Sequence, residues 1–385
     1  MSPRSAPHPR RRRTRRRGGL SVGLLLLVLC AGWAAHPTSA EDPGWAQAVG
    51  PREWSFPRDH GAHPAYRTEW WYFTGNLRDA GGRRYGYQLT FFRQGVRWEP
   101  THPENPWSLR DAYLAHFAVT EEEPPRFRHA ERLNRAGPGL AGALEGRMDV
   151  WNLDWTAVMK GETIRLRART AEMGLDLALV PRKPVVLHGE GGLSRKGPAP
   201  GQASYYASFT DLATEGHLVL GAGAEPLFVR GSSWFDQEFG SNQLSEEQAG
   251  WDWFSLHLSD GRDLMVYLLR RRDGTIEPAS SGTLVERDGS SRSLPLAEIT
   301  VEVRERWTSP RSGARYPSRW RLVAPGVELV FGALIPDQEL DTSGSTGVVY
   351  WEGAVWGEGT SGGRPVTCEG YVELTGYAGD LGGLF

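Results

Sequence analysis

The chain has 385 residues with 44 basic and 46 acidic side chains, a formal net charge of −2 at pH 7. The first 40 residues hold eight of the basic side chains and none of the acidic ones, so the remainder carries 36 basic against 46 acidic groups, a net charge of −10. That balance argues against nucleic acid and against an anionic membrane surface as partners.

Residues 1–40 have the pattern of a secretory signal. Seven arginines within residues 10–17 precede an apolar stretch over residues 20–35 and then small residues up to Ala40. The apolar stretch is short for a membrane span, which needs about 20 residues. We expect an exported protein, periplasmic or secreted, cleaved near Ala40, with the Sec and twin-arginine routes both open. A lipid anchor at Cys30 is the alternative, disfavoured because the residue before Cys30 is large.

Cysteine usage limits how the exported chain is stabilised. Once residues 1–40 are removed, Cys368 is the only cysteine, so no intrachain disulfide can form. Stability must come from burial of apolar side chains, and the remaining length suffices for two domains of ordinary size. Because Cys368 lies in a strand-like run, we interpret it as a small core residue and not as a nucleophile.

The first motif is a loop that contains Asp59, His60 and His63, shortly before Glu69. Two histidines and a carboxylate could bind zinc, but no helix is indicated to align them and no third ligand stands at a diagnostic spacing. We therefore predict no metal. We expect His60, His63 and Glu69 to be braced by hydrogen bonds and to lie at the mouth of a ligand site.

An aromatic run is duplicated along the chain. Residues 69–79, which include Trp70 and Phe73, align without gaps with residues 250–260, where Trp251 and Phe254 occupy the same places. Each copy is followed by a turn and an apolar run that ends in arginine. A repeat with this long spacing indicates two related units in tandem, each opening on the same hairpin, and not a solenoid.

Strand signals dominate the rest of the sequence. Short β-prone runs alternate with Gly, Pro, Asn and Asp at a spacing of about 8–12 residues, which is typical of all-β sandwiches and barrels. We predict an all-β protein of two tandem lipocalin-like (calycin-like) antiparallel β-barrels, with two sandwiches as the alternative. The predicted units are residues 41–233 and 234–385.

The segment that opens the second unit carries two closely spaced acids. In a strand, alternate side chains share a face, so Trp234, Asp236 and Glu238 point one way and the three residues between and after them point the other. If both carboxyls were buried, one would be held protonated, as a general acid requires. The alternative is that one of them pairs with an arginine such as Arg230 and both are partly solvated.

The second aromatic copy offers a further face. Trp251, Trp253 and His257 alternate with Asp252 and with apolar residues. If the face with the two indoles lines a cavity, it suits a flat or unsaturated ligand. The alternative is a packed aromatic core. The sequence lacks the nucleophile elbow of serine hydrolases, a phosphate-binding loop and a dinucleotide-binding motif.

Several motifs together resemble a known family. They are the block from Phe56 to Gly75, the Trp-x-Asp-x-Glu-x-Gly pattern of residues 234–240, the run of residues 250–254, and Gly-Tyr-x-Glu-Leu-Thr-Gly-Tyr at residues 370–377. They resemble the AttH-like family of secreted, lipocalin-like predicted hydrolases, which is related to carotenoid 1,2-hydratase. The similarity covers nearly the whole chain after residue 40, and it implies two tandem calycin-type barrels.

The resemblance also implies a chemistry. Carotenoid hydratases add water across a terminal isoprenoid double bond without a cofactor, which requires an acid, a wall that stabilises a carbocation, and a positioned water. Asp236 occupies the place of an aspartate that those enzymes keep as essential, whereas Trp234 stands where they carry a tyrosine. Their upstream His-x-Trp element has no match, because the region near Tyr205 and Tyr206 reads differently.

The sequence thus predicts a secreted protein that binds an apolar, isoprenoid or lipid-like molecule and hydrates or hydrolyses it without a cofactor. Asp236 is the predicted acid, and Glu238 raises the pKa of Asp236 or places the water. A non-catalytic carrier and a carbohydrate-active protein are the alternatives. The predicted ligand-binding residues are Trp234, Trp251, Asp252, Trp253 and His257 in the second unit and His60, His63, Glu69 and Trp70 in the first.

Overall fold

The structure, a computed structural model, describes residues 44–100, 102–242 and 244–379. The predicted signal, its cleavage near Ala40 and the alternative anchor at Cys30 lie outside the described residues. Within them the chain is almost entirely strands, and the helices are two short 3-10 turns, η1 (Arg58–His60) and η2 (Leu296–Glu298). None of the helices described is long and apolar enough to cross a membrane.

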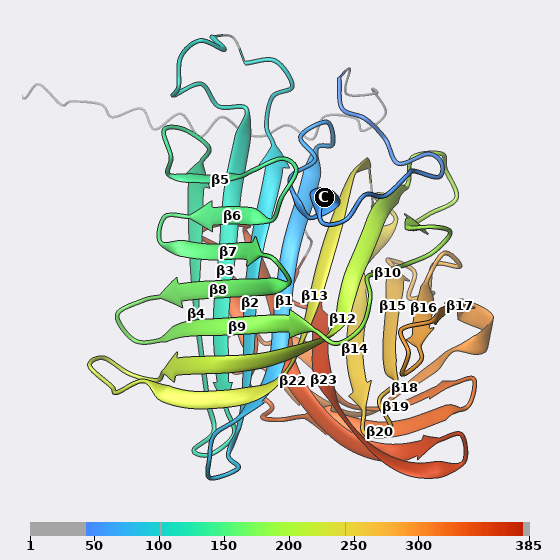
Figure 1. The fold of residues 1–385 in the computed structure, drawn as a ribbon. Helices are drawn as coiled ribbons and strands as arrows, with labels where there is room; N and C mark the ends of the chain where they lie inside the picture. The colour runs from blue at the N-terminus through green and yellow to red at the C-terminus, as the bar shows by residue number, and fades with distance from the viewer. Residues whose placement is uncertain (1–43, 101, 243, 380–385) are drawn as a thin grey trace, which may run out of the picture. The chain divides into compact units, whose positions relative to one another are not determined.

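The first antiparallel sheet follows the order β4-β3-β2-β1-β13-β12-β9-β8-β7-β6-β5, with β10 and β11 also paired to β12. It closes almost into a barrel, since Arg132 of β4 donates a hydrogen bond to the carbonyl of Asn152 in β6 at 2.8 Å. Figure 1 shows this sheet in blue to yellow. Its strands are β1 (Thr68–Arg78), β2 (Arg84–Gly95), β3 (Asp111–Glu121), β4 (Arg126–Arg135), β5 (Ala141–Ala143), β6 (Asp149–Asn152), β7 (Trp155–Lys160), β8 (Thr163–Arg169), β9 (Gly174–Pro181), β10 (Val186–Leu187), β11 (Leu193–Arg195), β12 (Ala203–Val219) and β13 (Leu227–Asn242).

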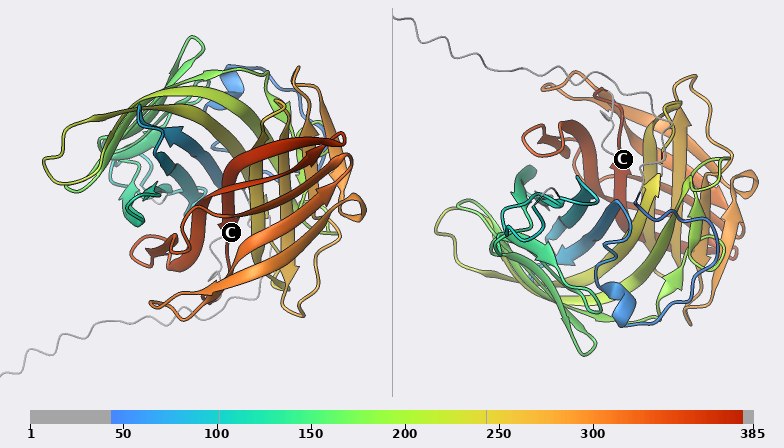
Figure 2. Two further views of the ribbon diagram at one scale, coloured as in Figure 1. Left: turned by 90° about the horizontal axis from the view of Figure 1, so that it is seen from below. Right: turned by 90° about the horizontal axis from the view of Figure 1, so that it is seen from above.

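The second antiparallel sheet follows the order β17-β16-β15-β14-β23-β22-β20-β19-β18, with β21 paired to β22, and it forms a half-barrel. Figure 2 shows the two curled sheets from below and from above. Its strands are β14 (Gln248–Leu258), β15 (Asp263–Arg271), β16 (Ser281–Val285), β17 (Ser291–Pro295), β18 (Thr300–Thr308), β19 (Arg315–Ala324), β20 (Val327–Ala333), β21 (Glu339–Thr342), β22 (Val348–Ser361) and β23 (Arg364–Leu374). The predicted all-β fold of two tandem lipocalin-like barrels is confirmed.

Each sheet curls around its own apolar core. Trp71 and Phe73 of β1 belong to the first core, and Phe254 of β14 and Trp320 of β19 to the second. Both interiors are thus filled by large side chains. Cys368 packs in the second core, where burial raises the pKa of its thiol to about 12.

The duplicated aromatic run forms the same element in both sheets. In the first sheet it is β1, paired with β2 and β13, and in the second it is β14, paired with β15 and β23. The predicted boundary between residues 233 and 234 falls inside β13, which pairs with β1 in the first sheet from Arg230 to Gly240. The chain passes to the second sheet after Asn242, and the described residues belong to one compact unit.

Candidate active site

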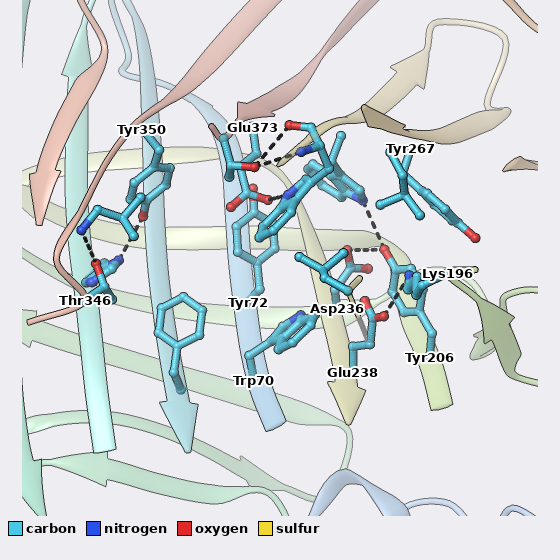
Figure 3. A pocket seen from close by; sticks show the side chains of 18 of the residues that line it. Trp70, Tyr72, Lys196, Tyr206, Asp236, Glu238, Tyr267, Thr346, Tyr350 and Glu373 are labelled. Carbon is cyan, nitrogen blue, oxygen red and sulfur yellow. Dashed lines mark hydrogen bonds and ion pairs between the residues drawn. The ribbon is translucent and has the colours of Figure 1, made fainter. Parts of the chain in front are cut away.

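A cavity lies between the two sheets and not inside either core. It encloses about 980 Å³ when the space open to solvent is included. The first sheet contributes side chains of β1, β2, β3, β12 and β13, and the second contributes side chains of β14, β15, β22 and β23. Figure 3 shows these side chains converging on the cavity.

Strand alternation explains why the same strands serve both a core and the cavity. On β1, Trp71 packs in the first core, whereas Trp70 and Tyr72 line the cavity. On β14, Phe254 packs in the second core, whereas Trp253 lines the cavity. Both faces of these strands are therefore buried, so they contain few of the charged residues that mark a solvent-facing strand.

Asp236 of β13 is the most constrained acid of the cavity. Its Oδ1 accepts hydrogen bonds from Trp234 Nε1 at 2.6 Å and from the Ser208 hydroxyl, and its Oδ2 accepts one from the Tyr206 hydroxyl at 2.6 Å. Burial raises the pKa of Asp236 to about 7, with a smaller contribution from the charge of Glu238, against the three donors, which lower it. Because Oδ1 already accepts two bonds and Oδ2 one, Oδ2 has room for the proton.

The donors to Asp236 are themselves held in place. Trp253 Nε1 donates to the Tyr206 hydroxyl at 3.0 Å, which leaves the Tyr206 proton for Asp236. On the other side, His188 Nε2 lies 2.7 Å from Ser208 Oγ. Since the Ser208 proton goes to Asp236, His188 Nε2 must be the donor there. Burial lowers the pKa of His188 to about 3, so its ring is neutral and carries that single proton.

Glu238 lies two residues further along β13, on the same face. Its Oε1 is 2.8 Å from Lys196 Nζ and accepts a hydrogen bond from Ser204. Burial is the largest single effect on Lys196 and would lower its pKa, but the charge of Glu238, the hydrogen bond to it and the charges of Tyr267 and Asp236 together outweigh burial, so the net shift is upward. Lys196 thus stays charged and paired, with its Nζ 4.2 Å from the centre of the Tyr267 ring.

A second pair of acids comes from the opposite sheet. Glu373 of β23 lines the cavity and accepts a hydrogen bond from Trp251 Nε1 at 2.8 Å, and burial raises its pKa to about 7. Its partner across the strand pair is Glu352 of β22, which is fully buried and accepts a hydrogen bond from the Tyr72 hydroxyl. Burial and then the charge of Glu373 raise the pKa of Glu352 well above its usual range, so Glu352 is a neutral acid.

Five of the predicted site residues line the cavity. Asp236 and Glu238 lie on one wall, with Trp70 from the neighbouring strand, and Trp251 and Trp253 come from the second sheet. They are brought together by strand pairing between segments far apart in the sequence. Trp234 does not line the cavity itself, but its indole N–H holds Asp236.

The other predicted ligand residues lie elsewhere. Asp252 points to the opposite face of β14, where it pairs with Arg270 at 2.8 Å. His257 shares the face of Trp253 but lies beyond the cavity, with its Nδ1 3.0 Å from Asp263. The expected alternation is therefore present, and the cavity ends before it reaches His257.

The loop of His60 and His63 is a braced structural element. His63 Nδ1 lies 2.8 Å from Glu69 Oε1, and its ring stacks on Phe239 at 3.7 Å. His60 is buried, and burial lowers its pKa to about 4. His60, His63 and Glu69 do not line the cavity. Within the described part of the chain, no group of three or more His, Cys, Asp or Glu side chains is arranged to hold a metal ion.

Several cavity residues are not among the site residues predicted from the sequence. Glu373 belongs to the C-terminal motif of residues 370–377, and its position in that motif was the available signal. Tyr206 stood in the region where the hydratase pattern has no match. Lys196, Gln88 and Tyr350 carry no local signal, because only the pairing of distant strands and loops brings them to the cavity.

Comparisons with known proteins agree with this architecture. A family model described as AttH-like matches residues 47–377. A putative AttH from Nitrosomonas europaea is 36% identical, covers 86% of this chain and 99% of its own, and has a TM-score of 0.78. Kievitone hydratase from Nectria haematococca is 15% identical over 87% of this chain and 97% of its own, with a TM-score of 0.67. CghA, solved with Sch210972, is 13% identical over 88% of this chain and 98% of its own, with a TM-score of 0.51. The last two are similar in fold alone, and a search of curated proteins finds no match.

Proposed function

Because this chain belongs to the AttH-like family, we propose that it binds an apolar, isoprenoid or lipid-like molecule between its barrels and adds water to a double bond of that molecule. Asp236 is the general acid, and no cofactor takes part. The observation that carries the proposal is a carboxyl group with a pKa near 7, buried against aromatic rings in a cavity. The name of kievitone hydratase, a solved protein of similar fold, gives further support. We propose also that residues 1–40 direct export.

The protonation step follows from the geometry around Asp236. A carboxyl with a pKa near 7 is protonated in a large fraction of molecules at neutral pH, yet it is acidic enough to give up its proton. The proton leaves Oδ2 and bonds to one carbon of the alkene, and the alkene's electron pair forms that bond. The three donors from Trp234, Tyr206 and Ser208 then stabilise the carboxylate that remains.

The cavity wall suits the cation that this step creates. Trp70, Trp253 and Tyr206 present aromatic rings beside Asp236, and each such ring stabilises a desolvated cation by about 1–2 kcal/mol. Glu238, held by Lys196, lies on the same face as Asp236 and positions the attacking water. The water oxygen bonds to the cationic carbon, and its proton passes to the Asp236 carboxylate, which restores the acid.

The experiment is to compare the wild type with Asp236→Asn on geraniol, farnesol and squalene in heavy-oxygen water. We expect the wild type to form an alcohol that carries the heavy oxygen, detected by mass spectrometry. Asp236→Asn should form none while its affinity for the alkene stays within about tenfold. Asp288→Asn, which changes an exposed turn carboxylate, is the control and should behave as the wild type.

Two outcomes would contradict the proposal. Product formation by Asp236→Asn would show that another group supplies the proton. Tight binding by the wild type with no product from any of the three alkenes would favour the non-catalytic carrier, which has the same cavity and no turnover to lose.

A further inference from the structure

The cavity has a second polar end, away from Asp236. Figure 3 shows Tyr350 and Thr346 at one end of the group of side chains, and Asp236, Glu238 and Lys196 toward the other. Near Tyr350, the cavity is lined by His116 of β3 and Gln88 of β2. The reaction proposed above uses none of these groups.

The Glu131 carboxylate, which does not itself line the cavity, determines which groups donate and which accept hydrogen bonds at this end. Glu131 of β4 accepts hydrogen bonds from the backbone N–H groups of Gly344 and Ser345, at 3.1 and 2.8 Å, and from the Ser345 hydroxyl. A carboxylate can only accept. The proton of the Ser345 hydroxyl is therefore committed to Glu131.

His116 lies between Ser345 and Tyr350, so the proton position on Ser345 determines which way the Tyr350 hydroxyl donates. Its Nε2 lies 3.1 Å from Ser345 Oγ and its Nδ1 lies 2.8 Å from Tyr350 Oη. Burial lowers the pKa of His116 to about 3, so the ring is neutral and has one proton. Because Ser345 has no proton left to give, Nε2 carries the proton and donates it. Nδ1 then accepts, and the Tyr350 hydroxyl donates to it.

The amide of Gln88 is oriented by the same chain. Its Nε2 donates to Thr90 Oγ1 at 2.7 Å and faces Tyr350 Oη at 3.5 Å, as it must when the tyrosine proton points to His116. The Gln88 Oε1 is left with no hydrogen-bond partner among the described residues, although the side chain is 0% exposed. A buried acceptor without a donor is unfavourable, so it indicates a place for a ligand's donor group.

Charge limits which donor can bind there. Among the described side chains that line the cavity, Lys196 is the permanent cation and it is paired with Glu238, while Asp236 and Glu373 are further acids. At pH 8, above the pKa of about 7 of both Asp236 and Glu373, these two acids are largely ionised, so an anionic ligand would be repelled. An ammonium group would find only neutral partners at this end, because Gln88 is an amide and Tyr350 a phenol.

We propose that Gln88, with Tyr350 and His116, forms a subsite that accepts a hydrogen bond from the hydroxyl group of an uncharged, otherwise apolar ligand. This inference rests on the proposed function, since it assumes that the ligand also reaches Asp236. The ligand class is then an unsaturated lipid-like alcohol and not a fatty acid or a pure hydrocarbon.

The test is a set of three probes that share one chain: farnesol, farnesyl methyl ether and farnesoic acid. Dissociation constants at pH 8 are measured by tryptophan fluorescence for the wild type, Gln88→Met and the control Gln94→Met, which changes a glutamine of the same strand that does not line the cavity. We expect the wild type to bind farnesol about tenfold tighter than the ether and farnesoic acid most weakly. Gln88→Met should weaken only farnesol, to the level of the ether, and Gln94→Met should keep the preference.

Equal affinity of the wild type for farnesol and its ether would overturn the inference, as would a preference that survives in Gln88→Met or tightest binding of farnesoic acid. The comparison of farnesol with its ether on the wild type needs no variant, so it tests the subsite even if Gln88→Met folds poorly. Each of these results leaves the proposed function intact, because none concerns Asp236. Failure of all three probes to bind would instead contradict both the subsite and the proposed ligand class.

Discussion

At the residue scale, the behaviour of Asp236 results from two opposed effects. Burial favours the neutral acid, while the hydrogen bonds from Trp234, Tyr206 and Ser208 favour the carboxylate. Burial is the larger effect, so the pKa rises, but the donors keep the carboxylate accessible. A group that must release a proton and recover it in each turnover needs both forms within reach.

The raised pKa of Asp236 predicts an unusual dependence of stability on pH. The ordinary pKa is 3.8 and the folded value is about 7, so between about pH 4 and pH 7 the folded state binds the proton that the unfolded state has lost. Stability contributed by this group therefore falls as the pH rises through that window, by at most about 4 kcal/mol. Asp236→Asn removes the titration, and it also alters three hydrogen bonds at every pH.

The measurement is the melting temperature of the wild type and of Asp236→Asn at pH 5 and pH 8. We expect the melting temperature of the variant minus that of the wild type to be higher at pH 8 than at pH 5. This holds whatever the sign of the difference at pH 5. A difference in melting temperature that is the same at both pH values would show that Asp236 ionises at its ordinary pKa.

At the scale of elements, the strands that separate a core from the cavity carry two roles. On β14, Phe254 packs in the second core and is 0% exposed, while its neighbour Trp253 lines the cavity and donates to Tyr206. The two side chains are adjacent in sequence and point to opposite faces. Substitutions at these positions should therefore separate stability from ligand binding and catalysis.

Phe254→Ala should lower the free energy of unfolding by about 3–5 kcal/mol, because it leaves a cavity in a filled core, and should leave ligand affinity nearly unchanged. Trp253→Phe keeps an aromatic ring but loses the N–H group that orients Tyr206, so it should cost less than about 1.5 kcal/mol of stability and lower the turnover rate. Urea unfolding gives the free energy of unfolding of each variant, and a turnover assay gives its rate. Equal effects of the two substitutions on stability and turnover would contradict the assignment of the two faces.

Alternation also explains how far the sequence could lead. Trp234, Asp236 and Glu238 lie on the face of β13 opposite to Phe235, as the alternation of a strand predicts, because a period of two is a local property. Alternation could not tell that this face meets the second sheet. Glu373 and Gln88 reach the cavity only through strand pairing and barrel packing, and these depend on contacts between residues far apart in the chain.

At the scale of the whole molecule, the cavity exists because two barrels with filled cores pack together. Buried polar contacts hold them, such as Lys183 with Asp263 at 2.7 Å and the Tyr72 hydroxyl with Glu352. The glycine at position 86 allows close approach, since a Cβ there would lie 2.6 Å from the Cβ of Ala354. A single lipocalin-like barrel can hold its ligand inside. In this protein the cavity lies between the sheets, and each sheet supplies one of its walls.

The proposed function requires that Asp236 transfers a proton to a carbon of an alkene bound between the barrels. The most direct test is to incubate the protein with farnesol in heavy water and to locate deuterium in the product by mass spectrometry. The product of the wild type should carry one deuterium on the carbon adjacent to the one that bears the new hydroxyl group. Asp236→Asn should form no such product. Carbon-bound deuterium formed equally by Asp236→Asn would contradict this role of Asp236, as would bound farnesol recovered from the wild type without carbon-bound deuterium.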